Sequence, residues 1–248
     1  MSTRRVLVIG GRCTRLARRN VDALLEALIL PIMVMLVFVY LFGGAIKIRG
    51  DYVNYVVPGV LVLCAAFGSA FTAVSVNQDI ASQIIDRFRS LDVPGVSILG
   101  GHVIASLVRN GLSIFIVFVV ALLVGFRPTA TPGNLAFAFA ILLLFILAFS
   151  WLSAAVGTLL SSPEAATGFS FFAFFLVNPS SALVPVATMP SWVQPFARNQ
   201  PVSAVVDATR SLLLENSTDG AWLAVMWCLG IGVVSAVMSG VAFQRRTQ

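Results

Sequence analysis

Residues 77–94 read NQDIASQIIDRFRSLDVP and form a polar, charged stretch between two long apolar runs. On a helix of about 100° per residue, apolar side chains share one face: Ile80, Ile84, Phe88 and Leu91, with Ile85 at the edge. The opposite face is polar and carries Asp79, Ser82, Gln83, Asp86, Arg89 and Ser90. A short amphipathic helix between membrane spans lies against either the bilayer surface or a protein outside the membrane.

The composition of the whole chain indicates a membrane protein. Of its 248 residues, 58% are hydrophobic and only 10% are charged, and the mean hydropathy is +0.96. Soluble globular domains carry about 25% charged residues. A soluble core of this size could not hide so much apolar surface, so the bilayer must be the solvent for most of it. We therefore expect residues 1–248 to form a single integral membrane domain.

The net charge of +6 does not indicate a nucleic-acid-binding protein. The basic residues cluster at the ends of apolar runs rather than along a groove with interleaved aromatic residues. Cys13, Cys64 and Cys228 are isolated from one another and lack CxxC spacing or a histidine cluster. This pattern supports neither a metal site nor a disulfide framework, and small apolar packing residues explain the cysteines better.

Six apolar runs have about the 20 residues that a helix needs to cross a hydrocarbon core. The predicted fold is therefore all-α, with six transmembrane helices at about 27–45, 56–76, 103–125, 135–160, 165–184 and 221–243. Residues 1–26 precede the first span and form an amphipathic helix in which one face is basic: Arg12, Arg15, Arg18 and Arg19. We expect this helix to lie on the cytoplasmic leaflet, with its arginines among anionic head groups.

The arginines also predict the topology. Ten fall on one side of the membrane: Arg4, Arg5, Arg12, Arg15, Arg18, Arg19, Arg87, Arg89, Arg245 and Arg246. Five basic residues fall on the other: Lys47, Arg49, Arg127, Arg198 and Arg210. By the positive-inside rule, both termini and the loop 77–94 are cytoplasmic, in a multi-pass protein of the cell inner (plasma) membrane.

Arg109 is the charge that falls inside a predicted span. Its predicted place near the cytoplasmic end lets the side chain snorkel to the interface, but it could also line a polar cavity. His102 falls at the same boundary, where a lone histidine is more often structural than functional. Both interpretations of Arg109 stay open at this point.

The fifth predicted span is rich in phenylalanine and is interrupted by Asn178, Pro179, Ser180 and Ser181. Proline breaks the helical hydrogen-bond ladder, so irregular backbone at that depth must be buried in protein or line a cavity. The aromatic side chains pack against lipid or protein, or they offer a soft surface to an apolar solute. On the second interpretation, the candidate substrate path is Phe171, Phe172, Phe175 and Asn178.

Residues 185–220 form a predicted outer re-entrant segment of two short amphipathic helices. Prolines stand where these helices begin, and the spacing of Trp192 and Phe196 suits a face embedded at the membrane interface. Such helices could cap a passage from the exterior. The candidate outer gate is Pro190, Trp192, Phe196, Asp207 and Arg210.

The sequence lacks the motifs of an enzyme or an ion-coupled carrier. It has no GxxxxGK[ST] loop, no HExxH, no GxSxG, and no pair of carboxylates inside the predicted spans. We therefore expect neither catalytic residues nor a bound metal or cofactor in this chain. If it moves a solute uphill, the energy arrives from a partner, and the cytoplasmic loop 77–94 is where it could arrive.

These features together resemble the membrane subunits of type 2 ATP-binding cassette exporters, in particular the daunorubicin-resistance branch. The resemblance covers the whole chain and is carried by the basic N-terminal helix, six spans, the stretch IDRFRSL at 85–91, and residues 189–210. It departs from the usual pattern at Asp92, where a proline commonly follows Arg-Ser-Leu, and here Pro94 comes two residues later. This departure concerns where the predicted cytoplasmic helix ends and not whether it is present.

The resemblance implies roles for these segments. The cytoplasmic loop would contain a coupling helix that docks on an ATPase subunit through Asp79, Ile84, Asp86, Arg87, Phe88, Arg89 and Leu91. The N-terminal helix resembles the connecting helix, and residues 190–214 resemble the re-entrant outer helices. The working unit would be two permease chains, as a homodimer or with a close paralogue, and two ATPase subunits that bind ATP and Mg.

The predicted function is thus that of an export permease for an amphipathic drug, lipid or glycolipid, powered by a separate ATPase. A non-transport membrane scaffold or assembly protein would share this topology and give the cytoplasmic loop another partner. A secondary carrier is disfavoured because intramembrane carboxylates and an obvious internal repeat are both missing from the sequence.

Overall fold

The computed structural model describes residues 21–42, 51–82, 95–177 and 179–246, and all regular elements within these ranges are helical. The long helices are α3 (Tyr52–Ala81), α5 (Gly95–Val124), α6 (Pro132–Leu159) and α10 (Ala221–Arg246). The shorter elements follow in chain order: α2 (Val21–Val37), a π-helix (Phe38–Phe42), α7 (Pro163–Val177), a 3-10 helix (Val186–Thr188), α8 (Gln194–Asn199), α9 (Pro201–Arg210) and a π-helix (Ser211–Glu215).

Four of the described helices are long and apolar enough to cross a membrane: Tyr52–Ala81, Ser97–Val124, Pro132–Leu159 and Ala221–Ala242. The apolar part of the first helix, Leu28–Leu41, is shorter, and α7 has 15 residues. The all-α membrane fold predicted from the sequence is therefore confirmed, whereas the count of six spans stays a prediction.

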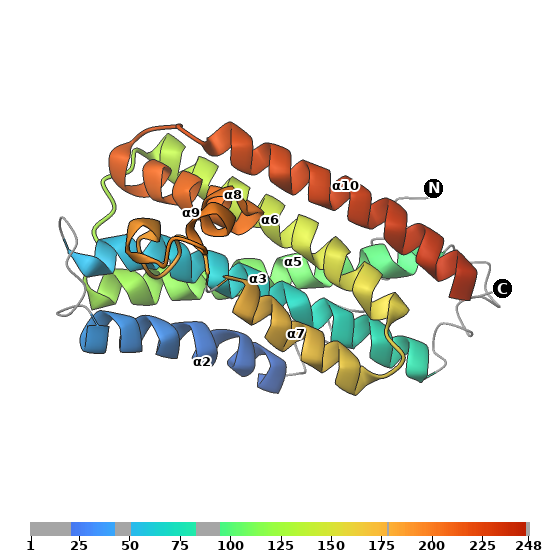
Figure 1. The fold of residues 1–248 in the computed structure, drawn as a ribbon. Coiled ribbons are helices and arrows are strands. Elements are labelled where there is room, and N and C mark those ends of the chain that lie inside the picture. The colour runs from blue at the N-terminus through green and yellow to red at the C-terminus, as the bar shows by residue number, and fades with distance from the viewer. Residues whose placement is uncertain (1–20, 43–50, 83–94, 178, 247–248) are drawn as a thin grey trace.

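The long helices lie side by side, with α3 between α10 and α2 (Figure 1). α3 packs against α5, α6, α7 and α9, and α10 packs mainly on α6. α7 starts at one end of the bundle and stops near its middle, and α8 and α9 occupy the remaining half (Figure 1). This arrangement brings the segment after α7 against the central helix.

Small residues allow the close packing around α3. Gly59 faces the backbone of Ala182, and Gly157 of α6 faces the backbone of Ala73, so that a Cβ atom at either glycine would overlap main-chain atoms. Because lipid tails are as apolar as leucine, membrane helices associate through such close contacts rather than through a hydrophobic driving force. α3 is buried along nearly its whole length as a result.

Four predicted boundaries need correction. α2 begins at Val21, so residues 21–26 belong to this helix rather than to the predicted N-terminal helix 1–26. α3 continues through Ala81, so residues 77–81 end this helix instead of opening the cytoplasmic loop. α5 begins at Gly95, eight residues before the predicted start at 103, because Ile98 and Leu99 are buried against Val76. The fifth helix runs over Pro163–Val177 rather than 165–184, since the segment that contains Pro179 does not continue it.

Candidate functional site

The backbone that follows α7 is irregular and is held by α9. Residues 179–184 form turns and two bends, Pro185 follows them, and Ser180, Ser181 and Ala182 are buried. We call residues 179–185 the break. Of the two alternatives for irregular backbone at this depth, burial in protein describes these residues.

Arg210 near the end of α9 is the centre of the contacts with the break. Its guanidinium donates to Asp207 Oδ1 at 2.9 Å, to Ser181 O at 2.7 Å and to Tyr55 O at 3.4 Å. Its guanidinium carbon also lies 4.1 Å from the centroid of the Tyr55 ring, a cation–π contact. A rigid guanidinium fork suits such multiple contacts better than a lysine would.

Further hydrogen bonds satisfy the backbone of the break. Ser181 donates from its hydroxyl to Asp207 Oδ1 at 2.7 Å, and Gln200 donates from Nε2 to Pro179 O at 2.7 Å. From the side of α3, Tyr52 donates to Leu183 O at 2.8 Å and Tyr55 donates to Ser181 O at 3.1 Å. Gln200, Tyr52 and Tyr55 therefore donate to backbone carbonyls that the break leaves without helical partners.

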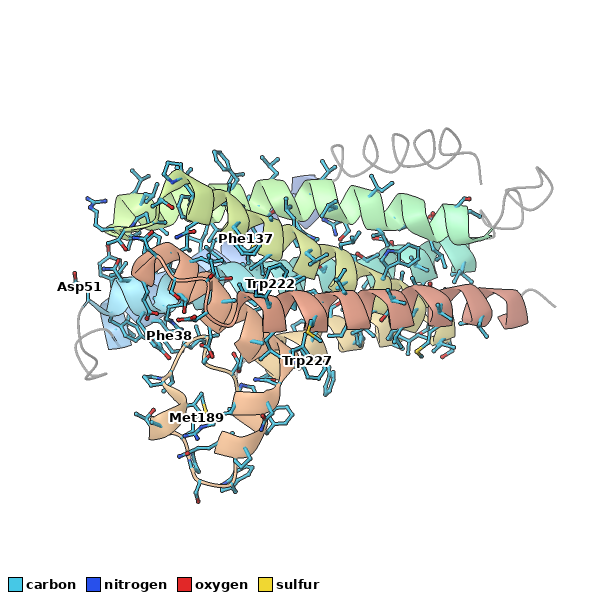
Figure 2. The ribbon with its side chains drawn as sticks, turned by 90° about the horizontal axis from the view of Figure 1, so that it is seen from above. Phe38, Asp51, Phe137, Met189, Trp222 and Trp227 are labelled. Carbon is cyan, nitrogen blue, oxygen red and sulfur yellow. The ribbon has the colours of Figure 1, made fainter. Side chains whose placement is uncertain are left out.

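The residues predicted as an outer gate divide into two groups. Asp207 and Arg210 face the break, as described above. Pro190, Trp192 and Phe196 are exposed, with 82% of Trp192 and 49% of Phe196 accessible. Figure 2 shows the segment around Met189 standing off from the bundle. The structure thus gives the two groups different surroundings, and a gating role for either group stays a prediction.

α7 has one face turned to α3 and one face turned outward. Its buried residues follow a helical spacing: Ala166, Ser170, Ala173 and Val177. Three of the phenylalanines predicted for the substrate path lie on the other face, where Phe171 is 55%, Phe172 62% and Phe175 66% exposed. Asn178, the fourth residue of that set, lies outside the described residues. The structure therefore places the three phenyl rings on the exposed face of α7, ahead of the break, and we call them the exposed aromatic surface.

Of the residues predicted to couple the chain to an ATPase, Asp79 is described. Its Oδ2 lies 3.1 Å from Nε2 of His102, which joins the end of α3 to the beginning of α5. The other predicted coupling residues (Ile84, Asp86, Arg87, Phe88, Arg89 and Leu91) and the basic residues of the N-terminal helix (Arg12, Arg15, Arg18 and Arg19) lie outside the described residues. His102 thus bridges two helices, and whether it has a role beyond this contact stays a prediction.

Asn77 is a buried residue whose role the sequence did not indicate. Its Nδ2 donates to Gly157 O at 3.0 Å and to Leu160 O at 2.8 Å. The last four carbonyls of a helix lack partners within that helix. Asn77 of α3 therefore caps the end of α6 from outside, next to the residues predicted to transmit movement from an ATPase.

A polar cluster is buried where α3, α5 and α6 meet. Ser106 accepts from Thr72 Oγ1 at 3.0 Å and from Asn110 Nδ2 at 2.9 Å, and its hydroxyl lies 2.8 Å from that of Ser150. Ser69 and Ser153 are also buried in full. The helical spacing of these serine, threonine and asparagine residues within apolar runs is the signal that could have predicted the cluster.

Arg109 lies near the middle of α5, fourteen residues after its first residue and fifteen before its last. The depth of Arg109 in the membrane stays a prediction, because α5 has 30 residues and a span needs about 20, so its first turns can lie outside the hydrocarbon core. Its Nη2 donates to Gly68 O of α3 at 3.2 Å. The guanidinium therefore has a partner in the neighbouring helix, and whether it also snorkels or lines a polar cavity stays open.

Comparison with known proteins agrees with this architecture. Residues 4–214 match the family described as ABC-2 type transporter. The chain is 32% identical over 215 residues to the daunorubicin resistance ABC transporter permease protein DrrB1 of Streptomyces coeruleorubidus, covering 86% of this chain and 75% of that protein. It is 25% identical over 237 residues to a probable doxorubicin resistance ABC transporter permease protein DrrC of Mycobacterium tuberculosis, covering 94% and 85%. This multi-pass membrane protein therefore belongs to the ABC-2 type transporter family.

Proposed function

We propose that this chain is the permease subunit of an ATP-driven exporter that moves an amphipathic drug, lipid or glycolipid outward. The family and the printed names of its relatives, which are resistance permeases for daunorubicin and doxorubicin, support the proposal. The sequence carries no nucleotide-binding loop of its own. The ATPase activity, with its ATP and Mg, therefore belongs to a separate subunit.

The exposed aromatic surface of α7 carries the proposal for the substrate path. Phe171, Phe172 and Phe175 are turned away from the bundle at the point where the helix stops. Phenyl rings form offset-stacked or edge-to-face contacts with planar aromatic solutes. These contacts do not require a charged group on the solute. A cargo with an apolar, ring-containing body therefore suits this surface better than a small ion does.

A second permease chain, either an identical copy or a close paralogue, would complete the path. Two α7 surfaces facing each other would enclose a channel with aromatic walls, whereas one surface alone is open to the membrane. The break would then lie at the outer end of this channel. Asp207 and Arg210 would fix its position as the ATPases open and close the opposite end.

Energy would enter through the cytoplasmic loop, with both termini on the same side of the plasma membrane. The contact between Asp79 and His102 holds the end of α3 beside the beginning of α5, on either side of this loop. A rigid connection of this kind would transmit a push on the loop to both helices. Ile84, Phe88 and Leu91 would bury against the ATPase, and Arg87 and Arg89 would contact it.

Transport by the reconstituted permease and its ATPase tests the substrate path. Replacement of Phe171, Phe172 and Phe175 together by alanine should abolish ATP-dependent daunorubicin transport while leaving assembly with the ATPase unchanged. Phe115→Ala is the matched control, since Phe115 of α5 is 56% exposed but lies on another helix. Equal transport by the triple variant and the control would exclude the α7 surface as the path.

A separate experiment tests the docking of the ATPase. Joint replacement of Arg87 and Phe88 by alanine should abolish both transport and co-purification of the ATPase subunit, with membrane insertion unchanged. A variant that still transports at the normal rate would exclude the coupling role of this loop.

A further inference from the structure

A second apolar feature lies where the α8–α9 segment meets α6 and α10. It is a groove of about 490 Å³ between α6, α10 and the junction of α8 with α9. Small-molecule sites have volumes of about 300–1,000 Å³, so the groove is large enough for a ligand. None of the functions described above uses it.

The wall contributed by α10 is long and follows one helical face: Trp227, Gly230, Ile231, Val234, Ser235 and Met238. Eleven residue steps at about 1.5 Å each make this wall about 16 Å long, parallel to the helix axis. A Cβ atom on Gly230 would meet nothing within 4 Å, so the absent side chain of this glycine leaves the middle of the groove open. The groove is thus elongated along the direction in which α10 runs.

The other walls are aromatic and aliphatic. α6 contributes Phe145, Phe149 and Leu152, and the α8–α9 junction contributes Phe196 and Gln200. Trp227 lies between α10 and the α8 segment (Figure 2). The residues that line the groove include no charged side chain, and Gln200 and Ser235 are its polar members. A charged or strongly hydrated ligand would lose its solvation there without compensation.

The surroundings of the groove identify its occupant. Residues Ala221–Ala242 of α10 are long and apolar enough to span a membrane, and the groove lies within this range. Val234 and Met238 on its rim are 58% and 49% exposed, and they continue into the exposed apolar face of α10 that includes Val233, Val237 and Val241. The groove therefore opens toward the bilayer, where acyl chains are the solvent.

We propose that this groove holds one acyl chain of a bilayer phospholipid. A single flexible chain matches an elongated, uncharged groove that is open along its length to lipid. The bound chain contacts Phe196 of α8 and Trp227 of α10 at once. α8 packs mainly on α9 and the 3-10 helix before it, so the lipid supplies contacts that join this short helix to α10. The lipid is therefore a structural component that stabilises residues 185–220, and it is not a transported substrate.

Photolabelling tests this proposal independently of transport. The full chain is placed in nanodiscs with a phosphatidylcholine that carries a diazirine in one acyl chain, and labelled residues are mapped by mass spectrometry. We expect labels to concentrate on Phe149, Phe196 and Ile231 above the level on the freely exposed residues of α10. In Gly230→Leu, whose side chain fills the groove, labelling of these three residues should fall to or below that level.

The matched control is Val233→Phe, which adds the same number of carbon atoms to α10 at a position that is 63% exposed and does not line the groove. This variant should be labelled as the native chain is. Equal labelling of the groove in the native chain and Gly230→Leu would overturn the proposal. Loss of labelling on addition of daunorubicin would also overturn it, because the groove would then bind the drug. Protection of the groove from the label by a second copy of the chain in a dimer would overturn it as well.

Discussion

Arg210 of α9 lies against the ring of Tyr55 of α3, with 4.1 Å between the guanidinium carbon and the ring centroid. Both side chains donate to one carbonyl, Ser181 O, at 2.7 Å from Arg210 and 3.1 Å from Tyr55. The break therefore has a partner on each side, one in the central helix and one in the outer segment. Its position depends on both helices.

Replacing Arg210 by alanine should separate α9 from the break. The change removes the cation–π contact and one of the two donors to Ser181 O, and we expect a loss of about 1–3 kcal/mol in the free energy of unfolding. Titration with SDS measures this loss, and hydrogen exchange should become faster over residues 195–210. Arg210→Lys keeps the charge without the planar fork, so its free energy of unfolding should lie between those of the native chain and of Arg210→Ala. An alanine variant as stable as the native chain would show that the contacts of Arg210 do not hold α9 against the break.

Asn77→Ala should destabilise the junction of α3 and α6. Asn77 is 2% exposed, and its Nδ2 bonds to Gly157 O and Leu160 O are made at the end of α6, where carbonyls lack helical partners. Loss of a buried donor costs about 1–3 kcal/mol in the free energy of unfolding.

The neighbouring Gln78 is exposed, so Gln78→Ala is a control of similar chemistry that should leave stability unchanged. Thermal unfolding in detergent compares the two variants. Equal midpoints for both would contradict the capping role of Asn77.

Ser106→Ala removes the residue that three other polar side chains share. Thr72, Asn110 and Ser150 would each lose a bond in a buried cluster. Hydrogen bonds between membrane helices are worth about 0.6–2 kcal/mol each, so the expected loss in the free energy of unfolding is about 1–3 kcal/mol.

Ser113→Ala is the matched control on the same helix. Ser113 is also buried, but its hydroxyl bonds the carbonyl of Arg109 four residues earlier in α5. Its loss should cost less, because no other helix is involved. If Ser113→Ala lowered the free energy of unfolding more than Ser106→Ala does, the bonds that Ser106 makes to other helices would not add to stability.

The sequence predicted the helices of this fold well, because long apolar runs interrupted by charge and proline leave few alternatives. The start of α5 could not be predicted in the same way. Gly95, Gly100 and Gly101 disfavour a helix locally, and the burial of Ile98 and Leu99 against α3 and its neighbours helps to offset this cost. Local propensity yields to tertiary packing at this boundary, and the position of Arg109 within its helix changes as a consequence.

The sequence indicated the candidate site less completely. Pro179 signals a break in the helix, and Asp207 and Arg210 are visible as charges in an apolar region. The partners of Arg210 outside α9 are Ser181 O and Tyr55, which lie 29 and 155 residues away from it in the sequence. A backbone carbonyl carries no signature in the side-chain pattern, so such a contact follows only from the folded chain. The same reason explains why the capping role of Asn77 was not predicted.

Gly59 provides the most direct test of how the break is seated on α3. A Cβ atom at this position would overlap the carbonyl of Ala182. The carbonyl belongs to the main chain and the Cβ atom is bonded directly to it, so neither can move without a shift of the backbone. Gly59→Ala should therefore push the break away from α3 and cost about 1–3 kcal/mol in the free energy of unfolding, although alanine is the better helix former. Gly168→Ala in α7 is the control, since a Cβ there meets nothing within 4 Å and the substitution should be neutral or stabilising. SDS titration of both variants gives the comparison.

If Gly59→Ala were as stable as Gly168→Ala, the break would not contact α3 as closely as the structure places it. The contacts of Tyr52 and Tyr55 with the carbonyls of the break would then need the same revision.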